Sequence, residues 1–143
     1  MNSTTYLIKT KLILDVNVII SAVLYGGNCE TLLRVIQIST HRYELCFSDE
    51  LVNELNSVVK RKFKRHRLLF DEIQELLLVR GTMFQPKARI LVCRDRNDNY
   101  LLELCEESNS DYLITGDKDL IELKSWGKTR ILKPSEFLNY LEN

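Results

Sequence analysis

Two short runs of this sequence each deliver a carboxylate directly after a predicted buried strand. Residues 112–115 are apolar or β-branched, Gly116 ends the run, and Asp117 follows at once. Residues 11–14, with three apolar side chains in a row, lead straight into Asp15. In open α/β sheets, ligands bind beyond the carboxyl ends of the strands. These two carboxylates are therefore expected at a ligand-binding edge.

Asp98 and Glu54 extend this set of acids. Asp98 comes just before the predicted helix 99–107, which leads into the strand 112–115. The start of this helix would therefore point at the same edge. Glu54 falls on the predicted helix 48–62, at the margin of its apolar arc and beside Val58. This position places Glu54 near the boundary between helix and sheet.

Carboxylates crowded at one edge repel one another, and their pKa values rise unless a cation neutralises them. Hard oxygen ligands of this kind suit Mg²⁺ or Mn²⁺. One or two such ions lower the pKa of bound water and stabilise an in-line attack on a phosphate. The four acids therefore predict a metal-assisted site.

Each acid also has a purely structural interpretation. Asp15, Asp98 and Asp117 all stand where a helix begins, and aspartates at such positions commonly cap the helix. Glu54 could equally be a surface carboxylate. The residues alone leave both interpretations open.

Apolar runs and breakers predict strands that alternate with helices along the whole chain. Such alternation favours a mostly parallel sheet covered by helices on both faces. We therefore expect a three-layer α/β/α sandwich with five strands. The expected strands are 11–15, 43–47, 89–93, 112–115 and 129–132.

The bulk composition limits the classes of function. A chain of 143 residues predicts one domain, 1–143, with its own core. Its formal net charge is zero, so nucleic acid or membrane binding would need a local patch. No apolar run approaches the roughly 20 residues of a membrane helix, and the N-terminus does not look like a signal peptide. Four cysteines without C-x-x-C spacing predict reduced thiols and a cytoplasmic protein.

One basic run, 60–67, stands out from the neutral whole. Cations suit the C-terminal end of a helix, so a solvated helix end is one interpretation. The other is a contact for RNA phosphates, which a neutral protein with an acidic site would need somewhere. The candidate nucleic-acid-binding residues are Lys60, Arg61, Lys62, Lys64 and Arg65.

The order of these motifs resembles the PIN-domain ribonucleases, particularly the stand-alone group that act as toxins of toxin–antitoxin pairs. The similarity covers nearly the whole chain. The matching segments are Leu14 to Val18, Ser48 to Leu55, Arg94 to Leu102, Asp111 to Leu120 and Pro134 to Leu138.

The resemblance implies a five-stranded PIN-like sheet and a divalent-metal-dependent endoribonuclease. It implies that the family's acids fall on Asp15, Glu54, Asp98 and Asp117, with Asn17, Thr115 and Asp119 in supporting positions. Arg96 stands where the third family motif often has proline, so Asp95 could share or replace the role of Asp98. We favour Asp98, because it directly precedes the predicted helix.

The resulting hypothesis is a Mg²⁺- or Mn²⁺-dependent endoribonuclease that hydrolyses RNA phosphodiesters. Asp15, Asp98 and Asp117 would hold one or two ions, and Glu54 would complete the site or orient the water. The implied partners are an RNA substrate, an antitoxin protein and a second copy in a homodimer, with no membrane.

Three alternatives belong to other classes of function. The chain could be an RNA-processing nuclease that has no antitoxin, or a catalytically silent protein-binding module. It could also be an aspartyl-nucleophile phosphatase. That phosphatase family usually has a second Asp two residues after the first, whereas Asn17 occupies the position here.

Overall fold

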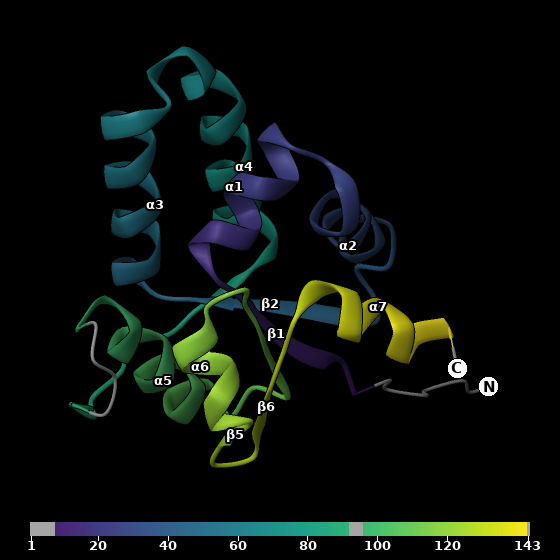
Figure 1. Ribbon diagram of the computed structural model, residues 1–143, viewed down its shortest axis with the longest axis vertical. Coiled ribbons are helices and arrows are strands. Elements are labelled where there is room, and N and C mark those ends of the chain that lie inside the picture. The colour runs from purple at the N-terminus through teal and green to yellow at the C-terminus, as the bar shows by residue number, and fades with distance from the viewer. Residues whose placement is uncertain (1–7, 92–95, 143) are drawn as a thin grey trace.

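A six-stranded sheet forms the centre of the computed structural model, which describes residues 8–91 and 96–142 (Figure 1). The strand order is β3-β2-β1-β4-β6-β5, and every neighbouring pair is parallel except β5 and β6. The predicted mostly parallel sheet is therefore confirmed. The strands are β1 (Thr10–Leu14), β2 (Tyr43–Phe47), β3 (Thr82–Met83), β4 (Tyr112–Ile114), β5 (Ser125–Trp126) and β6 (Thr129–Leu132).

The prediction of five strands is wrong, and part of the error lies at 89–93. Within the described part of that range, residues 89–91 form no strand, and residues 92–93 lie outside the described residues. Ile90 is buried but its two neighbours are exposed, so this run does not have the two covered faces of a central parallel strand. The amide of Ile90 instead donates to Oε2 of Glu103 at 2.9 Å. The edge place beside β2 is taken by β3.

The second additional strand is β5, which pairs antiparallel with β6. Gly127, with φ of +59°, lies in the turn between them, where a positive φ favours glycine. Trp126 lies in this edge strand, and its indole Nε1 donates to Oε1 of Glu106 at 3.0 Å.

Helices cover both faces of the sheet. In Figure 1, α1, α2 and α7 lie on one side and α5 and α6 on the other, so the predicted three-layer arrangement is confirmed. The helices are α1 (Val16–Leu24), α2 (Gly27–Ile38), α3 (Asp49–Lys62), α4 (Arg67–Arg80), α5 (Arg96–Ser108), α6 (Lys118–Leu123) and α7 (Pro134–Glu142), with a short 3-10 turn η1 (Lys64–His66).

Helices α3 and α4 form a hairpin that projects away from the sheet, with η1 at its tip (Figure 1). Ser48 caps α3 by accepting a hydrogen bond from the amide of Leu51 at 3.3 Å. Phe63 packs on Phe70 across the hairpin, with ring centroids 6.4 Å apart. The base of the hairpin therefore lies at the sheet and its tip lies far from it.

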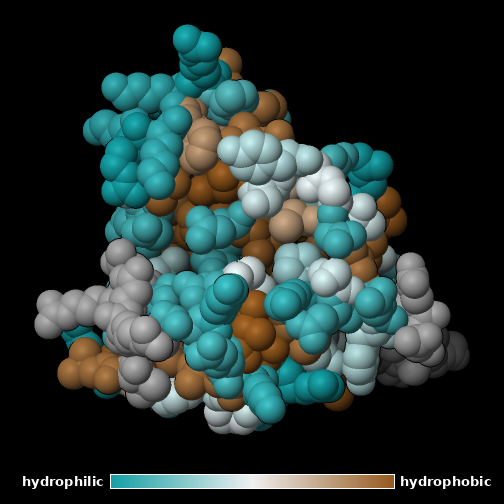
Figure 2. Space-filling model, viewed as in Figure 1, coloured by the Kyte–Doolittle hydropathy of each residue, from teal (hydrophilic) through white to brown (hydrophobic). Residues whose placement is uncertain are grey.

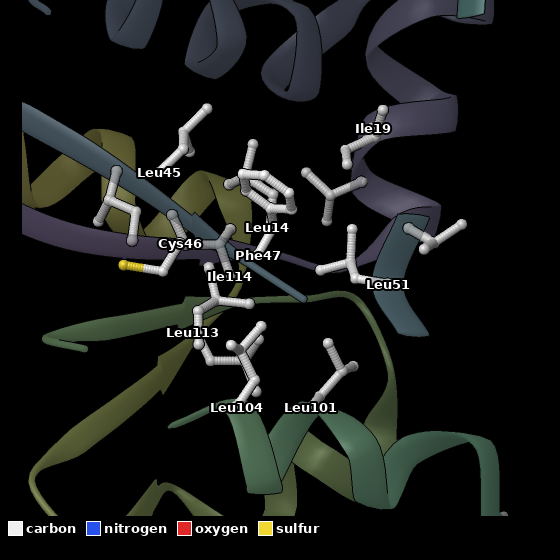
Figure 3. Packing of buried hydrophobic residues seen from close by; sticks show 14 of the residues in the cluster. Leu14, Ile19, Leu45, Cys46, Phe47, Leu51, Leu101, Leu104, Leu113 and Ile114 are labelled. Carbon is white, nitrogen blue, oxygen red and sulfur yellow. The ribbon is translucent and has the colours of Figure 1, made fainter. Parts of the chain in front are cut away.

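The core is built where apolar strands meet the apolar faces of helices. Figure 3 shows Leu101 and Leu104 of α5 pointing at the sheet from one side, while Ile19 of α1 lies on the other side. Leu12 and Ile13 of β1 are fully buried, as expected for a central strand with both faces covered.

Among the described residues, no single helix is long and apolar enough to cross a membrane. The pair α1 and α2 passes such a test by length and composition only, and the two helices are bent by 100° at the break between them. Five side chains of α1 are buried in the core of the protein.

Candidate active site

The register of the two central strands brings Asp15 and Thr115 side by side. Leu14 of β1 pairs with Ile114 of β4, and the amide of Asp15 donates to the carbonyl oxygen of Ile114 at 3.0 Å. The hydroxyl of Thr115 donates to Oδ2 of Asp15 at 2.6 Å. Both side chains are buried. The predicted meeting of two strand ends is therefore realised at this edge.

Asp15 occupies the N-cap position of α1, but its side chain accepts no capping hydrogen bond in that helix. The carboxylate accepts from the hydroxyl of Thr115, and backbone hydrogen bonds at Val16 and Asn17 also lower its pKa. The side chain of Asp15 therefore connects the start of α1 to the residue that follows β4.

Asp117 is tied to the same threonine. Its amide donates to the hydroxyl oxygen of Thr115 at 3.0 Å. Its own Oδ1 accepts from the amide of Asp119 at 2.8 Å and so caps α6. Asp117 thus has the structural role considered from the sequence and still lies at the acidic edge. One hydroxyl links the acids that follow two different strands.

Three carboxylates converge at this edge: Asp98, Asp117 and Asp119 each offer an oxygen, and these oxygens lie within 4.8 Å of one another. Asp98 is buried, and the other two are partly exposed. Asp98 was expected to precede its helix. Because α5 begins at Arg96, Asp98 lies in the first turn, where the helix dipole favours a carboxylate.

The donor set suits a hard divalent cation. All three ligand atoms are carboxylate oxygens, and Mg²⁺ and Mn²⁺ prefer such ligands, whereas zinc and copper favour nitrogen and sulfur. Partial exposure of two of the acids leaves access for water and substrate. The residues present therefore fit a magnesium-type site.

The electrostatics of the edge favour a cation. Burial raises the pKa of Asp15, the hydroxyl of Thr115 lowers it, and the nearby charge of Asp117 raises it further. A bound cation would offset both the burial of the Asp15 carboxylate and its repulsion by Asp117, and so would favour the ionised form.

Tyr100 joins this site although the sequence did not single it out. Burial raises the pKa of its hydroxyl, and the charges of Asp15, Glu54 and Asp98 raise it further. The phenol is therefore a neutral group surrounded by carboxylates. A tyrosine two residues after Asp98, on the apolar side of the same helix, was the available signal.

Glu54 is brought to the same place from another element. It is partly buried on α3, near the base of the hairpin, and its charge acts on Tyr100 together with those of two aspartates. Glu50, one turn earlier on α3, also acts on Tyr100 and was not predicted. The structure thus assembles acids from α3, from α5 and from the end of β1 around one tyrosine.

The remaining candidates are Asn17, Asp95 and the five basic residues. Asn17 is exposed in the first turn of α1. Asp95 lies outside the described residues. The five basic candidates are exposed near the tip of the hairpin, around the end of α3 and η1. Eight residues of helix separate Glu54 from Lys62, which is a rise of about 12 Å.

The sheet is mostly parallel and covered on both faces, and acids follow β1 and β4 at the edge where ligands bind in such sheets. The family model described as the PIN domain matches residues 11–119. The chain therefore belongs to the PIN domain family, and PIN domains are generally nucleases.

Two individual proteins are similar to this chain. The uncharacterized protein MJ1680 of Methanocaldococcus jannaschii is 26% identical over 155 residues, which covers 94% of each chain. A chain in the crystal structure of VapBC2 from Rickettsia felis, bound to a DNA fragment from their promoter, has a TM-score of 0.60. The match covers 85% of this chain and 97% of the other at 13% identity, so this similarity concerns the fold.

Proposed function

We propose that this chain is a divalent-metal-dependent endoribonuclease, and that residues 1–143 form one nuclease domain. The observation that carries the proposal is the group Asp98, Asp117 and Asp119, whose oxygens lie within 4.8 Å of one another beside the buried Asp15. A site made of carboxylates alone is suited to hold Mg²⁺ or Mn²⁺ and to act on a phosphodiester.

In this proposal Asp98, Asp117 and Asp15 hold one or two ions, with Asp119 supporting them. A bound divalent cation supplies an activated water and stabilises charge on the phosphate. Thr115 positions two of the acids at once, because its hydroxyl donates to Asp15 and accepts from the amide of Asp117. Such outer hydrogen bonds fix the orientation of ligands.

Glu54 and Tyr100 are the groups available to the substrate side of the site. Glu54 is a carboxylate on a separate helix, so it can accept a proton from the attacking water or orient that water. Tyr100 keeps its proton, because its pKa is raised by burial and by the surrounding acids. Its hydroxyl is therefore a donor that can hold a carboxylate or a phosphate oxygen.

We further propose that the chain is the cytoplasmic toxin of a toxin–antitoxin pair. The resemblance of its motifs to stand-alone PIN toxins supports this role, and so does the fold shared with a chain of the VapBC2 assembly. The partner would be an antitoxin protein that covers the acidic edge, and the toxin would form a homodimer.

The nuclease proposal is tested by incubating mixed RNA with the wild-type chain and with Asp117→Asn, in Mn²⁺ or in EDTA. Cleavage should require both the metal and the carboxylate. Glu122→Gln is the matched control, because Glu122 is an exposed acid on α6, the helix that Asp117 caps, and is not a member of the group. Cleavage that persists in Asp117→Asn or in EDTA would reject the proposed site.

A further inference from the structure

The α3–α4 hairpin contains a pocket that the acidic site does not use. It has a volume of about 580 Å³, within the range of pockets that hold small organic ligands. It lies between the two helices, close to the tip. Its lining residues are Asn56, Val59, Lys60, Lys64, Arg67, Phe70, Asp71 and Gln74.

Three cations face this pocket. Lys60 lies in the last turn of α3, Lys64 lies in η1 and Arg67 begins α4, so three separate elements supply them. With one carboxylate from Asp71, the lining carries a net charge of three minus one, or +2. Within the part of the chain that the structure describes, none of the three cations forms an ion pair. The pocket therefore attracts an anion that the protein itself does not supply.

The start of α4 adds to this positive charge. Its N-cap residue, His66, makes no side-chain capping bond, and its first turn contains no acid. The dipole of the helix favours an anion at this end, and no carboxylate of the first turn offsets it. Arg67, the first residue of α4, would meet a phosphate at the same end of the helix.

The rest of the lining fits a nucleotide better than a bare phosphate. Val59 and Phe70 are buried and give the pocket an apolar floor. Asn56 and Gln74 offer amide groups that donate and accept, as the edge of a base requires. Asp71 adds an acceptor suited to an amino group or a ribose hydroxyl.

The pocket is separate from the acidic edge. Asn56 follows Glu54 by two residues, which is a rotation of about 200° around α3, so the two side chains leave opposite flanks of the helix. Figure 2 shows hydrophilic side chains covering the outward surface of α3 and the top of the hairpin. An RNA strand that is bound at the acidic edge can follow this polar surface to reach the pocket.

We propose that this pocket holds a nucleotide of the RNA substrate, with Lys60, Lys64 and Arg67 around its phosphate, as a second anchoring point away from the cut. This inference rests on the proposed ribonuclease function. It selects among the basic candidates, since Arg61, Lys62 and Arg65 do not line the pocket, and it adds Arg67.

The test measures binding of a labelled single-stranded RNA of roughly 16 nucleotides, the upper end of single-strand site sizes. The full chain carries Asp117→Asn and is kept in EDTA, so that the RNA is not cut. In that background, Lys64→Gln with Arg67→Gln removes pocket charges. Lys62→Gln with Arg65→Gln is the matched control, because it removes one lysine and one arginine from the same basic run outside the pocket.

The pocket pair should weaken binding by roughly tenfold, the usual effect of removing one or two charge-assisted hydrogen bonds. The slope of log affinity against log salt should fall by about 0.7 for each phosphate that is no longer neutralised. The control pair should weaken binding far less. Equal weakening by the two pairs would overturn the pocket and leave only diffuse attraction. Thermal unfolding of each variant shows that the fold is kept.

Competition separates the sources of the phosphate. Uridine monophosphate should displace the RNA from the pocket more effectively than inorganic phosphate. If inorganic phosphate competes equally well, the site takes an anion and the nucleotide assignment fails. A wild-type chain that binds RNA through the pocket without cutting it would reject the nuclease function alone. If the wild-type chain cuts RNA but the pocket variant and the control variant bind RNA equally well, the pocket alone is rejected.

Discussion

The acidic edge of the sheet and the basic tip of the hairpin carry opposite charges and are built in opposite ways. At the edge, Asp15 and Asp98 are only 6% and 8% exposed, and Thr115 is fully buried between strands. At the tip, the side chains of η1 are exposed. The acids at the edge are held by a hydroxyl and by backbone amides, whereas the cations at the tip make no ion pairs with described residues.

This difference follows from what each region has to do. A reaction at a phosphate requires groups fixed to a fraction of an ångström, and burial with hydrogen bonds fixes them. Attraction of a polyanion requires charge at long range and tolerates mobile side chains. The edge should therefore respond sharply to the loss of single atoms, and the tip should respond to ionic strength.

The largest effect is expected at the edge, from Asp98→Asn. It should lower RNA cleavage by roughly a thousandfold, since several kcal/mol of electrostatic stabilisation are lost at tenfold per 1.4 kcal/mol. Thermal unfolding in Mn²⁺ measures the same loss, because the wild-type chain should gain about 2.7 kcal/mol at a hundredfold excess over Kd and the variant much less. A variant that Mn²⁺ stabilises as strongly as the wild-type chain would remove Asp98 from the site.

The next effect is expected from Thr115→Val, which keeps the shape of the side chain and removes the hydroxyl that joins Asp15 to Asp117. Removing such an orienting hydrogen bond typically costs about 10- to 100-fold in activity or metal affinity. Thr115→Ser keeps the hydroxyl and should recover most of the activity. If valine and serine behave alike, the hydroxyl does not position the acids.

At the tip, the expected change is in salt dependence. If Lys60, Lys64 and Arg67 together neutralise the one phosphate held in the pocket, raising salt from about 50 to about 200 mM should lower the contribution of the pocket to kcat/KM by roughly threefold, given a single-strand slope of about −0.7 per phosphate. The value of kcat at saturating RNA should change little, because the tip lies far from the acids. A kcat that falls in parallel would show that salt acts on the acidic edge instead.

The smallest effect concerns α3, which joins the two regions. Ser48→Ala removes the hydroxyl that accepts from the amide of Leu51 and should cost about 1 kcal/mol of stability. For a chain of this size that corresponds to roughly 3 °C in Tm. Cleavage by the folded variant should stay near the wild-type rate. A large loss of activity without a loss of stability would mean that the cap also sets the position of Glu54.

A fifth measurement compares buried and exposed acids in metal-free protein. Burial raises the pKa of Asp15, so at neutral pH its ionised form lowers the stability of the fold. Asp15→Asn should therefore raise Tm in EDTA, because it removes a buried charge. The exposed Glu122→Gln should leave Tm nearly unchanged. A lower Tm for Asp15→Asn would show that the carboxylate is already compensated without metal.

The sequence by itself determined much of the layered fold. Strands such as 11–14 and 112–114 are short apolar runs bounded by breakers, and the helices between them have one apolar face. The spacing of the apolar residues therefore predicts both kinds of element. The sequence also placed acids at strand ends, because a residue that follows a buried strand must emerge at the edge of the sheet.

Only the tertiary structure decided which groups share one place. No local pattern predicts that β1 lies beside β4 in the register that brings Asp15 next to Thr115. Nor does one predict that carboxylate oxygens of Asp119 and Asp98 lie within 4.8 Å of each other. The run at 89–91 forms no strand because Glu103 takes the amide of Ile90, and Glu103 is 13 residues away along the chain. Likewise, Arg67 faces Lys60 across a pocket only because the hairpin folds back. Contacts between distant segments depend on how whole elements pack, and local residue patterns do not fix that packing.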